Sequence, residues 1–206
     1  MTRYGMAIDK RRCVACNRCA MACHVEHNLP DDVFWNRGKT SGGDAYLTPG
    51  GEYPRNLTME SYTFACQHCD KPQCVAVCPT GASYKREDGI VLVDYEKCIG
   101  CGACLHGCPY TGVRTMVKDP KYSLDFKLGD ANVPDIVDRT VSKCTFCVER
   151  IDRGERPRCI DVCFCDARWF GDLDDPNSEI NKVMEGREVE QLHTDKGTGP
   201  NVFFMI

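Results

Sequence analysis

Short apolar stretches lead into two of the cysteine-rich segments of this chain. Ile8 precedes Cys13 at the same distance at which Val93 precedes Cys98, and an aspartate follows each of the two apolar residues. Apolar residues that alternate with polar ones over a few positions indicate a short strand. We therefore predict an internal repeat, in which a short strand leads into each of these two segments.

The other two cysteine-rich segments show the complementary pattern, because a small residue and an aromatic residue follow them. Ala82–Tyr84 comes after Cys78, and Ala167–Trp169 comes after Cys163. Each stretch predicts a strand that leaves a cysteine-rich segment. The apolar residues 90–93 then follow an Asp-Gly pair, which is a frequent hairpin corner. We predict a hairpin between residues 82–84 and 90–93.

These strands predict two modules, one inserted into the other. The hairpin places residues 60–115 in one compact module, and the remaining incoming and outgoing strands place 1–30 with 140–175 in a second, split module. Residues 31–59 are rich in Gly, Pro and Asp and read as an irregular surface loop, and residues 116–139 carry turn signals. Insertions of this length in a small domain usually have a function or cover something.

Residues 176–206 form a C-terminal extension in this interpretation. It contains a short amphipathic stretch, Glu179–Val189, and ends in the apolar run Val202–Ile206. Such a run is expected to be buried, either on the body of the same protein or on a partner subunit. The flexible residues 197–200 before it favour an arm, so we expect the run to contribute to assembly with a partner.

The cysteines carry the strongest chemical signal. Sixteen of the seventeen fall into four groups of four, and only Cys165 stands outside them. Two groups have the spacing C-x2-C-x2-C-x3-C, and the others have C-x2-C-x4-C-x3-C and C-x2-C-x11-C-x3-C. In sequence order the groups are Cys13, Cys16, Cys19, Cys23; Cys66, Cys69, Cys74, Cys78; Cys98, Cys101, Cys104, Cys108; and Cys144, Cys147, Cys159, Cys163. This spacing is typical of bacterial ferredoxins, in which three thiolates hold one [4Fe–4S] cluster and the fourth reaches a neighbouring one. The protein is therefore predicted to bind four [4Fe–4S] clusters and to transfer electrons.

Disulfides and zinc are the alternative explanations of the cysteines. A secreted disulfide scaffold brings a signal peptide, whereas the first residues here contain no apolar run of that kind, so we expect no secretory leader. Cysteines two residues apart also make poor disulfide partners. Structural zinc sites usually join two C-x2-C pairs across a dozen or more residues. Zinc remains an alternative for the fourth group alone.

Composition limits the other functions. Apolar residues make up 42% of the sequence, but this figure includes the cysteines, so the clusters must form part of the core. We expect no stable fold without iron and sulfide. No run of about eighteen apolar residues occurs, so we expect no direct membrane span. The net charge of −4 argues against nucleic acid as a partner.

Some polar residues near the cysteines have two interpretations. His68 and His106 either pack locally or tune a cluster or couple a proton. A set of basic residues around the fourth group is either a solvated helix face or a docking surface for a protein or an acidic membrane. These basic residues are Arg139, Lys143, Arg150, Arg153, Arg156, Arg158 and Arg168.

The residues between the cysteines resemble those of a known family. The words CQHC at 66–69, KREDG at 85–89, CIGC at 98–101 and CPY at 108–110 are similar to the four-cluster iron–sulfur subunit of molybdopterin oxidoreductases, such as dimethyl sulfoxide reductase and polysulfide reductase B chains. The similarity covers roughly residues 4–176. With the strand pattern, it implies an α+β fold of two nested bacterial-type 2[4Fe–4S] ferredoxin-like modules with long loop insertions and a C-terminal extension.

The resemblance also implies a function and a ligand assignment. Such a subunit has no catalytic residues, and it carries electrons between a quinone-linked membrane subunit, or another donor, and a large catalytic subunit with a molybdenum or tungsten pterin site. The implied ligand sets are Cys13, Cys16, Cys19 with Cys163; Cys23 with Cys144, Cys147, Cys159; Cys66, Cys69, Cys74 with Cys108; and Cys78 with Cys98, Cys101, Cys104. The substrate of the complex stays open, and so does its location, either exported folded with a partner that carries a twin-arginine signal or on the cytoplasmic face.

A freely diffusing polyferredoxin is the alternative function. The long insertions and the apolar C-terminus favour a permanent subunit, because a shuttle gains little from additional docking surface. The sequence departs from the family pattern after its last cysteine group, where Phe164 and Cys165 follow Cys163 in place of a proline. The C-x3-C spacing favours Cys163 as the ligand, and Cys165 is then expected to be an ordinary buried cysteine.

Overall fold

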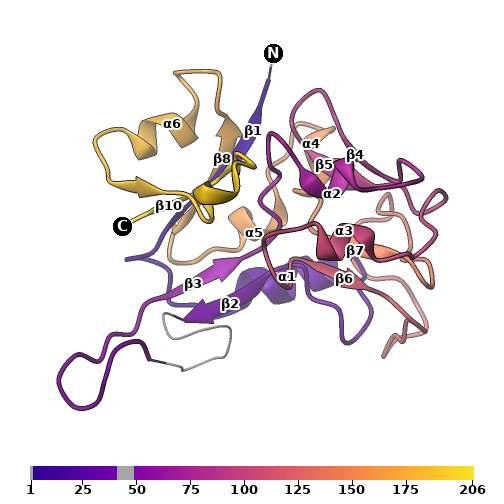
Figure 1. Cartoon of the computed structure of the whole chain (residues 1–206), viewed down its shortest axis with the longest axis horizontal. Coiled ribbons are helices and arrows are strands. Elements are labelled where there is room, and N and C mark those ends of the chain that lie inside the picture. Colours follow the sequence, from indigo (N-terminus) through magenta and orange to yellow (C-terminus); the bar gives the residue numbers. More distant parts are fainter. Residues whose placement is uncertain (1, 41–48) are drawn as a thin grey trace.

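The computed structural model describes residues 2–40 and 49–206. Short helices are interspersed with strands that pair mostly antiparallel, which makes the fold α+β (Figure 1). The strands are β1 Tyr4–Asp9, β2 Arg37–Thr40, β3 Ser61–Phe64, β4 Ser83–Lys85, β5 Val91–Val93, β6 Arg114–Met116, β7 Val141–Lys143, β8 Arg168–Asp172, β9 Val189–Glu190 and β10 Val202–Met205. The helices are α1 Arg18–Glu26, α2 Gln73–Ala76, α3 Ala103–His106, α4 Val148–Ile151, α5 Arg158–Asp161 and α6 Glu179–Met184, and a 3-10 turn, η1, spans Thr194–Lys196. No described helix is long and apolar enough to cross a membrane.

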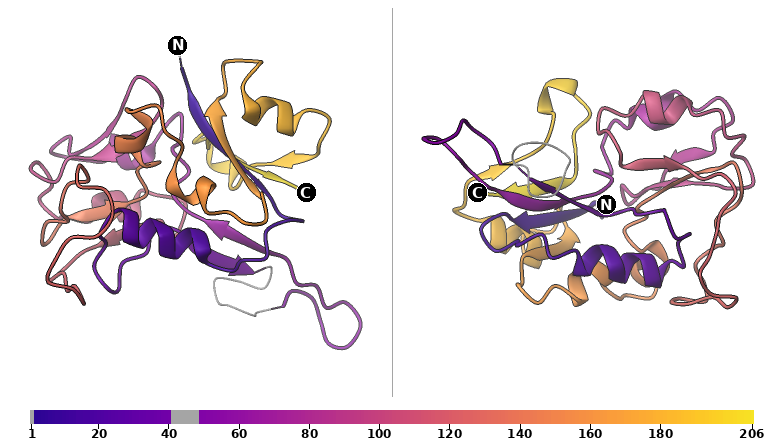
Figure 2. Two further views of the ribbon diagram at one scale, coloured as in Figure 1. Left: turned by 180° about the vertical axis from the view of Figure 1, so that it is seen from behind. Right: turned by 90° about the horizontal axis from the view of Figure 1, so that it is seen from below.

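The largest sheet has four strands in the order β8-β1-β10-β9. β1 pairs antiparallel with β8, so that Ile8 lies opposite Arg168, and it pairs parallel with β10. The strand predicted before Cys13 and the strand predicted after Cys163 are thus direct neighbours, although they lie far apart in the sequence (Figure 2).

β1 is buried on both of its faces. On one face Met6 and Ile8 pack in a core that includes Cys19 of α1 and Cys159 of α5. On the other face Ala7 packs against Ile180 of α6. The sheet is therefore a layer between the cysteine-bearing helices and α6, and it fixes where the first cysteine loop starts.

The C-terminal run does not form an arm on a partner subunit. Val202–Met205 is strand β10, which lies between β1 and β9 in the central sheet. Val202, Phe204 and Met205 are buried there. The expectation that these residues reach a partner is wrong, because the main-chain groups of β1 offer them an unpaired strand edge within the same molecule.

The predicted hairpin is confirmed. β4 and β5 pair antiparallel, with Ser83 opposite Val93. The Arg86 N–H donates to the Ile90 carbonyl at 2.8 Å, and Gly89 adopts a φ of 88° at the corner. This left-handed value suits glycine, which has no side chain to clash with the backbone.

The two insertions contribute to the core. Within residues 31–59 lies β2, which pairs with β3, and the side chains of Val33 and Trp35 are buried. The prediction of an irregular surface loop is therefore wrong for this part, while residues 41–48 lie outside the described residues. From residues 116–139, Val117 and Ile136 join Trp35 in a cluster around Cys23. The insertions thus cover a cysteine site, whereas residues 49–60 extend from the body as an arm (Figure 1).

Candidate metal centres

The backbone makes the same turn in each cysteine group. Two residues after the first cysteine, φ is positive, with 45° at Ala15, 42° at His68, 64° at Gly100 and 58° at Phe146. A left-handed residue in such a loop turns successive N–H groups toward one side, where they can approach an anion or a sulfur atom. Only Gly100 is a glycine, the residue type that favours positive φ, so the sequence does not predict a turn shared by all four groups.

Short helices place the last two cysteines of each group. The third cysteine of the groups lies in α1, α2, α3 and α5, respectively, and the fourth follows four residues later. One helical turn separates residues four positions apart, so the two thiols point from one short segment toward two different neighbours.

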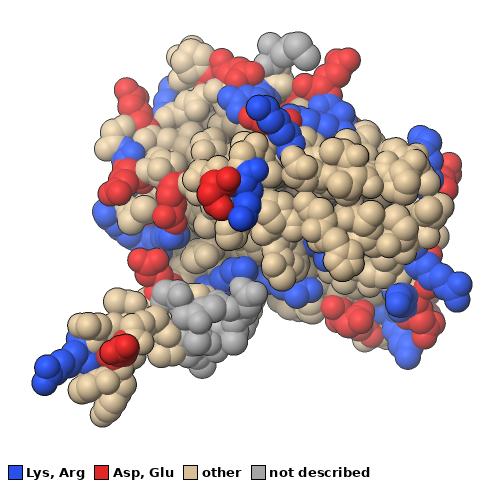
Figure 3. All heavy atoms as spheres, in the orientation of Figure 1, with Lys and Arg blue, Asp and Glu red and all other residues tan. Residues whose placement is uncertain are grey.

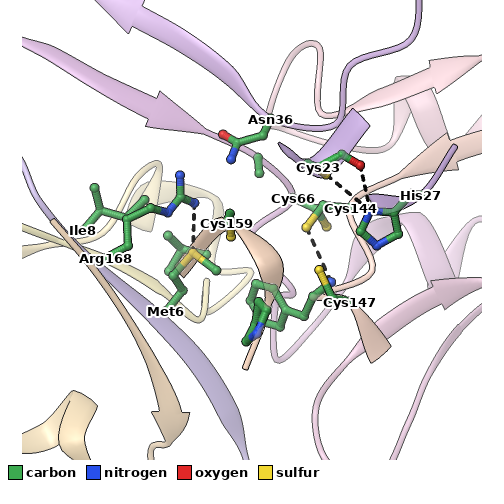
Figure 4. Close-up of a pocket in the computed structure, with 14 residues that line it drawn as sticks. Met6, Ile8, Cys23, His27, Asn36, Cys66, Cys144, Cys147, Cys159 and Arg168 are labelled. Carbon is green, nitrogen blue, oxygen red and sulfur yellow. Dashed lines mark hydrogen bonds between the residues drawn. The ribbon is translucent and has the colours of Figure 1, made fainter. Parts of the chain in front are cut away.

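Three hollows each bring together three cysteines of one group and the last cysteine of another group, and two of the hollows are lined by a fifth cysteine as well. Site A contains Cys13, Cys16, Cys19 and Cys163. Site B contains Cys23, Cys144, Cys147 and Cys159, which converge on one cavity in Figure 4. Site D contains Cys78, Cys98, Cys101 and Cys104.

The remaining four cysteines, Cys66, Cys69, Cys74 and Cys108, we call site C. Cys66 and Cys74 both lie close enough to interact electrostatically with the thiols of Cys69 and Cys108, so the four lie near one another. Cys66 also lines the hollow of site B. The structure thus brings together the members of each set that the resemblance implied, while ligation itself stays a prediction.

Cys165 lies where the sequence did not place it. It is partly exposed, and it lines the hollow of site A together with Cys163. The expectation of an ordinary buried cysteine is wrong, because Phe164 projects outward with 60% of its surface exposed and leaves the following loop at the surface. The Cys163 sulfur accepts the Ala167 N–H at 3.4 Å.

Backbone N–H groups approach sulfur at sites B and D as well. The Phe146 N–H lies 3.5 Å from Cys144 Sγ, and the Arg158 N–H lies 3.4 Å from Cys147 Sγ. At site D the Ser83 N–H donates to Cys78 Sγ at 3.3 Å. Hydrogen bonds to ligand sulfur are one means by which a protein adjusts the potential of an iron–sulfur cluster.

The burial of the thiols fits a metal cluster. Burial raises the pKa of Cys144 and of Cys108 to about 12, and that of Cys69 to about 11. A thiol in such surroundings becomes a thiolate only when a positive charge compensates it, and iron supplies that charge on binding.

Three basic side chains lie inside the molecule among these sites. Arg114, Lys143 and Arg168 are buried. Arg114 Nη2 donates to Cys74 Sγ at 2.9 Å, and Arg168 lines the hollows of both site A and site B. For Lys143 and Arg168, the expectation of a solvated face or docking surface is therefore wrong, and no feature of the sequence marks Arg114 as buried.

The other basic residues near the fourth group are mostly engaged in ion pairs. Arg150 contacts Glu26 and Asp161, and Arg153 contacts Asp130. Such pairs near the surface contribute little individually. Glu26, Asp130, Arg150 and Arg153 line an open hollow beside α1.

His68 packs locally. Its ring is fully buried, lies 3.6 Å from that of Phe146 between centroids, and its Nδ1 accepts the Val91 N–H at 3.1 Å. Burial holds the pKa of His68 well below its usual value, so the ring is neutral. His106, by contrast, is exposed at the end of α3.

The donor set fits [4Fe–4S] clusters. Among residues 2–40 and 49–206, no group of three or more His, Cys, Asp or Glu side chains could hold a metal ion directly. Each site brings four thiols together instead, and backbone N–H groups approach sulfur at sites A, B and D. Nε of Arg114 and Nε of Arg168 are also buried without a hydrogen-bond partner among the described residues. Sulfide of a cubane is an acceptor that suits both donors.

Comparisons with known proteins agree with this chemistry. The family described as "4Fe-4S dicluster domain" matches residues 57–123 and 132–173. The putative iron–sulfur B subunit of a dimethyl sulfoxide reductase from Halobacterium salinarum is 42% identical, over 100% of this protein and 79% of the relative. The B component of polysulfide reductase from Wolinella succinogenes is 36% identical, over 98% of this protein and 94% of the relative. The B component of tetrathionate reductase from Salmonella typhimurium is 35% identical, over 98% of this protein and 72% of the relative.

These relatives match at least 98% of the sequence, so the similarity is not confined to the cysteine-rich segments. Their names describe iron–sulfur or B subunits of reductases and not the catalytic subunits. This protein belongs to the family of ferredoxin-type iron–sulfur electron-transfer subunits that includes the B chains of dimethyl sulfoxide reductase and polysulfide reductase.

Proposed function

We propose that the protein holds four [4Fe–4S] clusters, one at each of sites A to D, and relays electrons through them to or from a large catalytic subunit with a molybdenum or tungsten pterin site. The nested division is part of this proposal. Residues 1–30 with 140–175 hold the clusters of sites A and B, and residues 60–115 hold those of sites C and D.

The observation that carries the proposal is the origin of the thiols at sites A, B and D. In each hollow, three cysteines of one group meet a cysteine of another group that the ligand sets assign to the same cluster, which is the exchange found in two-cluster ferredoxins. A zinc site built from the fourth group alone would not draw Cys23 into the same hollow.

The four sites follow one another in a row. Arg168 lines the hollows of both A and B, so these two sites adjoin. Cys66 of site C lines the hollow of B. Arg114 binds Cys74 of site C and also donates to Ser83, a residue of the hollow of D. The order A-B-C-D gives electrons one path with two ends.

Both ends of this row reach the surface. Cys16 of site A and Cys101 of site D are exposed, whereas every cysteine of site B is buried or nearly so. Exposed apolar side chains surround both ends, with Val14 and Phe164 at A and Val77 and Ile99 at D. The face over α2 and α3, beside site D, is largely free of charge in Figure 3. Such faces fit two protein partners, one at each end.

Within this function the protein's own residues bind, insulate and tune. The clusters, when bound, supply the one-electron redox chemistry. The thiols of each site fix their positions, and the N–H groups directed at sulfur stabilise the added charge. Trp35, Val117 and Ile136 keep water from site B. No acid–base or nucleophilic residue is needed.

The partners follow from the names of the relatives. They are B or iron–sulfur subunits of dimethyl sulfoxide, polysulfide and tetrathionate reductases, which act as parts of larger complexes. We propose the same arrangement here, with the catalytic subunit at one end of the row and a redox partner, such as a quinone-reactive membrane subunit, at the other. The apolar C-terminus no longer argues against a free polyferredoxin, because β10 is internal. The argument for a permanent subunit rests instead on the exposed apolar side chains at both ends of the row.

Purification of the tagged protein from its native host without oxygen tests the proposal. We expect about sixteen iron atoms per molecule, four for each cubane, and a large co-purifying subunit that contains pterin with molybdenum or tungsten. Full iron content without a large subunit would support the free polyferredoxin instead. Zinc in place of iron would contradict the cluster assignment.

A further inference from the structure

Three buried basic side chains have no carboxylate partner among the described residues. Arg114, Lys143 and Arg168 are 6%, 2% and 5% exposed, respectively. None of them forms a salt bridge with a described Asp or Glu, although the surface arginines nearby do. Basic residues are almost never buried without a compensating negative charge. A negative group that belongs to the working protein must therefore lie beside each of them.

Arg168 lies at the boundary between sites A and B. It starts strand β8 and points from the sheet toward both hollows, and Figure 4 shows it across the cavity from His27. Nη1 donates to Thr63 Oγ1 at 2.6 Å and Nη2 contacts Met6 Sδ at 3.1 Å. These neutral partners orient the guanidinium without neutralising it.

Lys143 lies at the boundary between sites B and C. It is the last residue of β7, and its Nζ donates to the carbonyl of Cys144 at 2.7 Å and to that of Val91. The thiols that face its charge are Cys144 of site B and Cys66 and Cys74 of site C.

Arg114 lies at the boundary between sites C and D. It opens strand β6, donates to Cys74 Sγ of site C, and reaches Ser83 Oγ at 3.1 Å beside site D. Cys104 of site D also faces its charge. Each of the three junctions in the row A-B-C-D therefore contains one buried cation.

We infer that Arg168, Lys143 and Arg114 are positioning residues that hold one fixed positive charge at each junction between neighbouring clusters. This inference rests on the four clusters and the ligand sets of the proposed function. Each added electron makes a cluster more negative, and charges interact strongly through the poorly polarisable interior. A cation between two clusters raises the potential of both, and it weakens the repulsion between two neighbouring reduced clusters.

The physical consequence is selective. Removal of one cation must affect the two clusters that it touches and leave the distant two nearly unchanged, because the interaction falls with distance. Removal of the Arg168 charge is expected to lower the potentials of the clusters at sites A and B. Removal of the Arg114 charge is expected to lower the potentials of those at sites C and D. A residue that only supports the fold would not produce this pairwise pattern.

The experiment compares midpoint potentials of the clusters in the purified complex by redox titration followed by electron paramagnetic resonance, with iron content measured on each sample. Arg168→Gln keeps a hydrogen-bond donor and removes the charge, and Arg168→Lys keeps the charge. Arg139→Gln is the control, since Arg139 is a highly exposed arginine whose backbone oxygen lies beside Gly100 of site D. Arg114→Gln is the matching variant at the other end.

We expect wild-type iron content, lower potentials for two of the four clusters in Arg168→Gln, and lower potentials for the other two in Arg114→Gln. Arg168→Lys should restore most of the shift, and Arg139→Gln should cause none. Unchanged potentials, or an equal shift of all four, would overturn the inference while leaving the four clusters in place. If Arg168→Gln loses iron, the midpoint potentials of the four clusters in Arg114→Gln test the inference alone. Fewer than four clusters in the wild type would instead contradict the proposed function.

Discussion

At the scale of single residues, the cysteine loops depend on backbone conformation as much as on the thiols. Gly100 and Gly102 both adopt positive φ values in the loop of site D, at 64° and 74°. They differ in their surroundings, because a Cβ at Gly100 would lie 2.1 Å from the Arg139 carbonyl oxygen, whereas a Cβ at Gly102 would lie no closer than 3.8 Å to Met116. The two glycines therefore form a matched pair.

We predict that Gly100→Ala loses the cluster of site D and that Gly102→Ala keeps it. Both variants carry the strain of a left-handed alanine, about 1–2 kcal/mol. Only Gly100→Ala must also move the backbone of residue 139. Iron analysis should show a loss of about four atoms per molecule for Gly100→Ala alone. Equal iron content in the two variants would show that the backbone at residue 139 moves aside without loss of the cluster.

The two cysteines at the end of the fourth group give a second prediction. Cys163 accepts a backbone hydrogen bond and belongs to the C-x3-C spacing, while Cys165 lies beside it at the rim of the same hollow. We expect Cys163→Ser to lose or convert the cluster of site A, and Cys165→Ser to retain all four clusters. Iron content and the resonance spectrum of each variant check this. The reverse result would assign the ligand to Cys165 and explain why no proline follows Cys163.

At the scale of elements, local pattern predicted the parts whose partner is close in sequence. The hairpin of β4 and β5 was foreseen because its corner and both strands lie within a dozen residues. β2 was missed because Arg37–Thr40 carries almost no apolar signal and is a strand only through its pairing with β3. The apolar run at the C-terminus was recognised as buried, but no local feature reveals that its partner is β1, at the other end of the sequence.

Strand β10 gives the prediction at this scale. Phe204 is fully buried in the core beside Ile8 of β1, and the neighbouring Phe203 is partly exposed. Phe204→Ala should destabilise the folded protein by about 3–5 kcal/mol, since it leaves a cavity. Phe203→Ala should cost about 1–2 kcal/mol. Thermal unfolding of the iron-loaded variants measures both, and iron loss at site A is expected to accompany the first, because β1 positions Cys13.

A similar cost for the two phenylalanine variants would contradict the burial of β10 in the sheet. Retained iron in a protein truncated after Asn201 would also contradict it. That second result would restore the expectation of an arm outside the cluster-bearing core.

At the scale of the whole molecule, the sequence predicts which cysteines form the sites better than it predicts which other side chains surround them. The spacing of the cysteines marks the four groups, because spacing within a group is a local property, and the resemblance implied the exchange between groups that the fold brings about. The buried cations could not be foreseen. Lys143 and Arg168 stand among exposed arginines in the sequence, and only the folded structure separates residues that face solvent from those that face the hollows. The interior of this protein is organised around charge as well as around apolar contacts.

Removal of the clusters gives the last prediction. Of the five buried apolar clusters among the described residues, four contain cysteines, namely Cys19 and Cys159, Cys23, Cys69, and Cys74 with Cys104. The fifth, formed by Ala7, Ile180 and Met205, contains none. Without iron, the hollows lose their contents and the cations lose their compensation, so packing should fail around sites A to D. Amide hydrogen exchange after treatment with chelator and oxidant should therefore become fast in residues 10–40 and 60–165. Residual protection is expected only where β1, β10 and α6 meet, because their shared core does not depend on a cluster. Protection that persists equally in all parts would show that the protein holds its fold without metal.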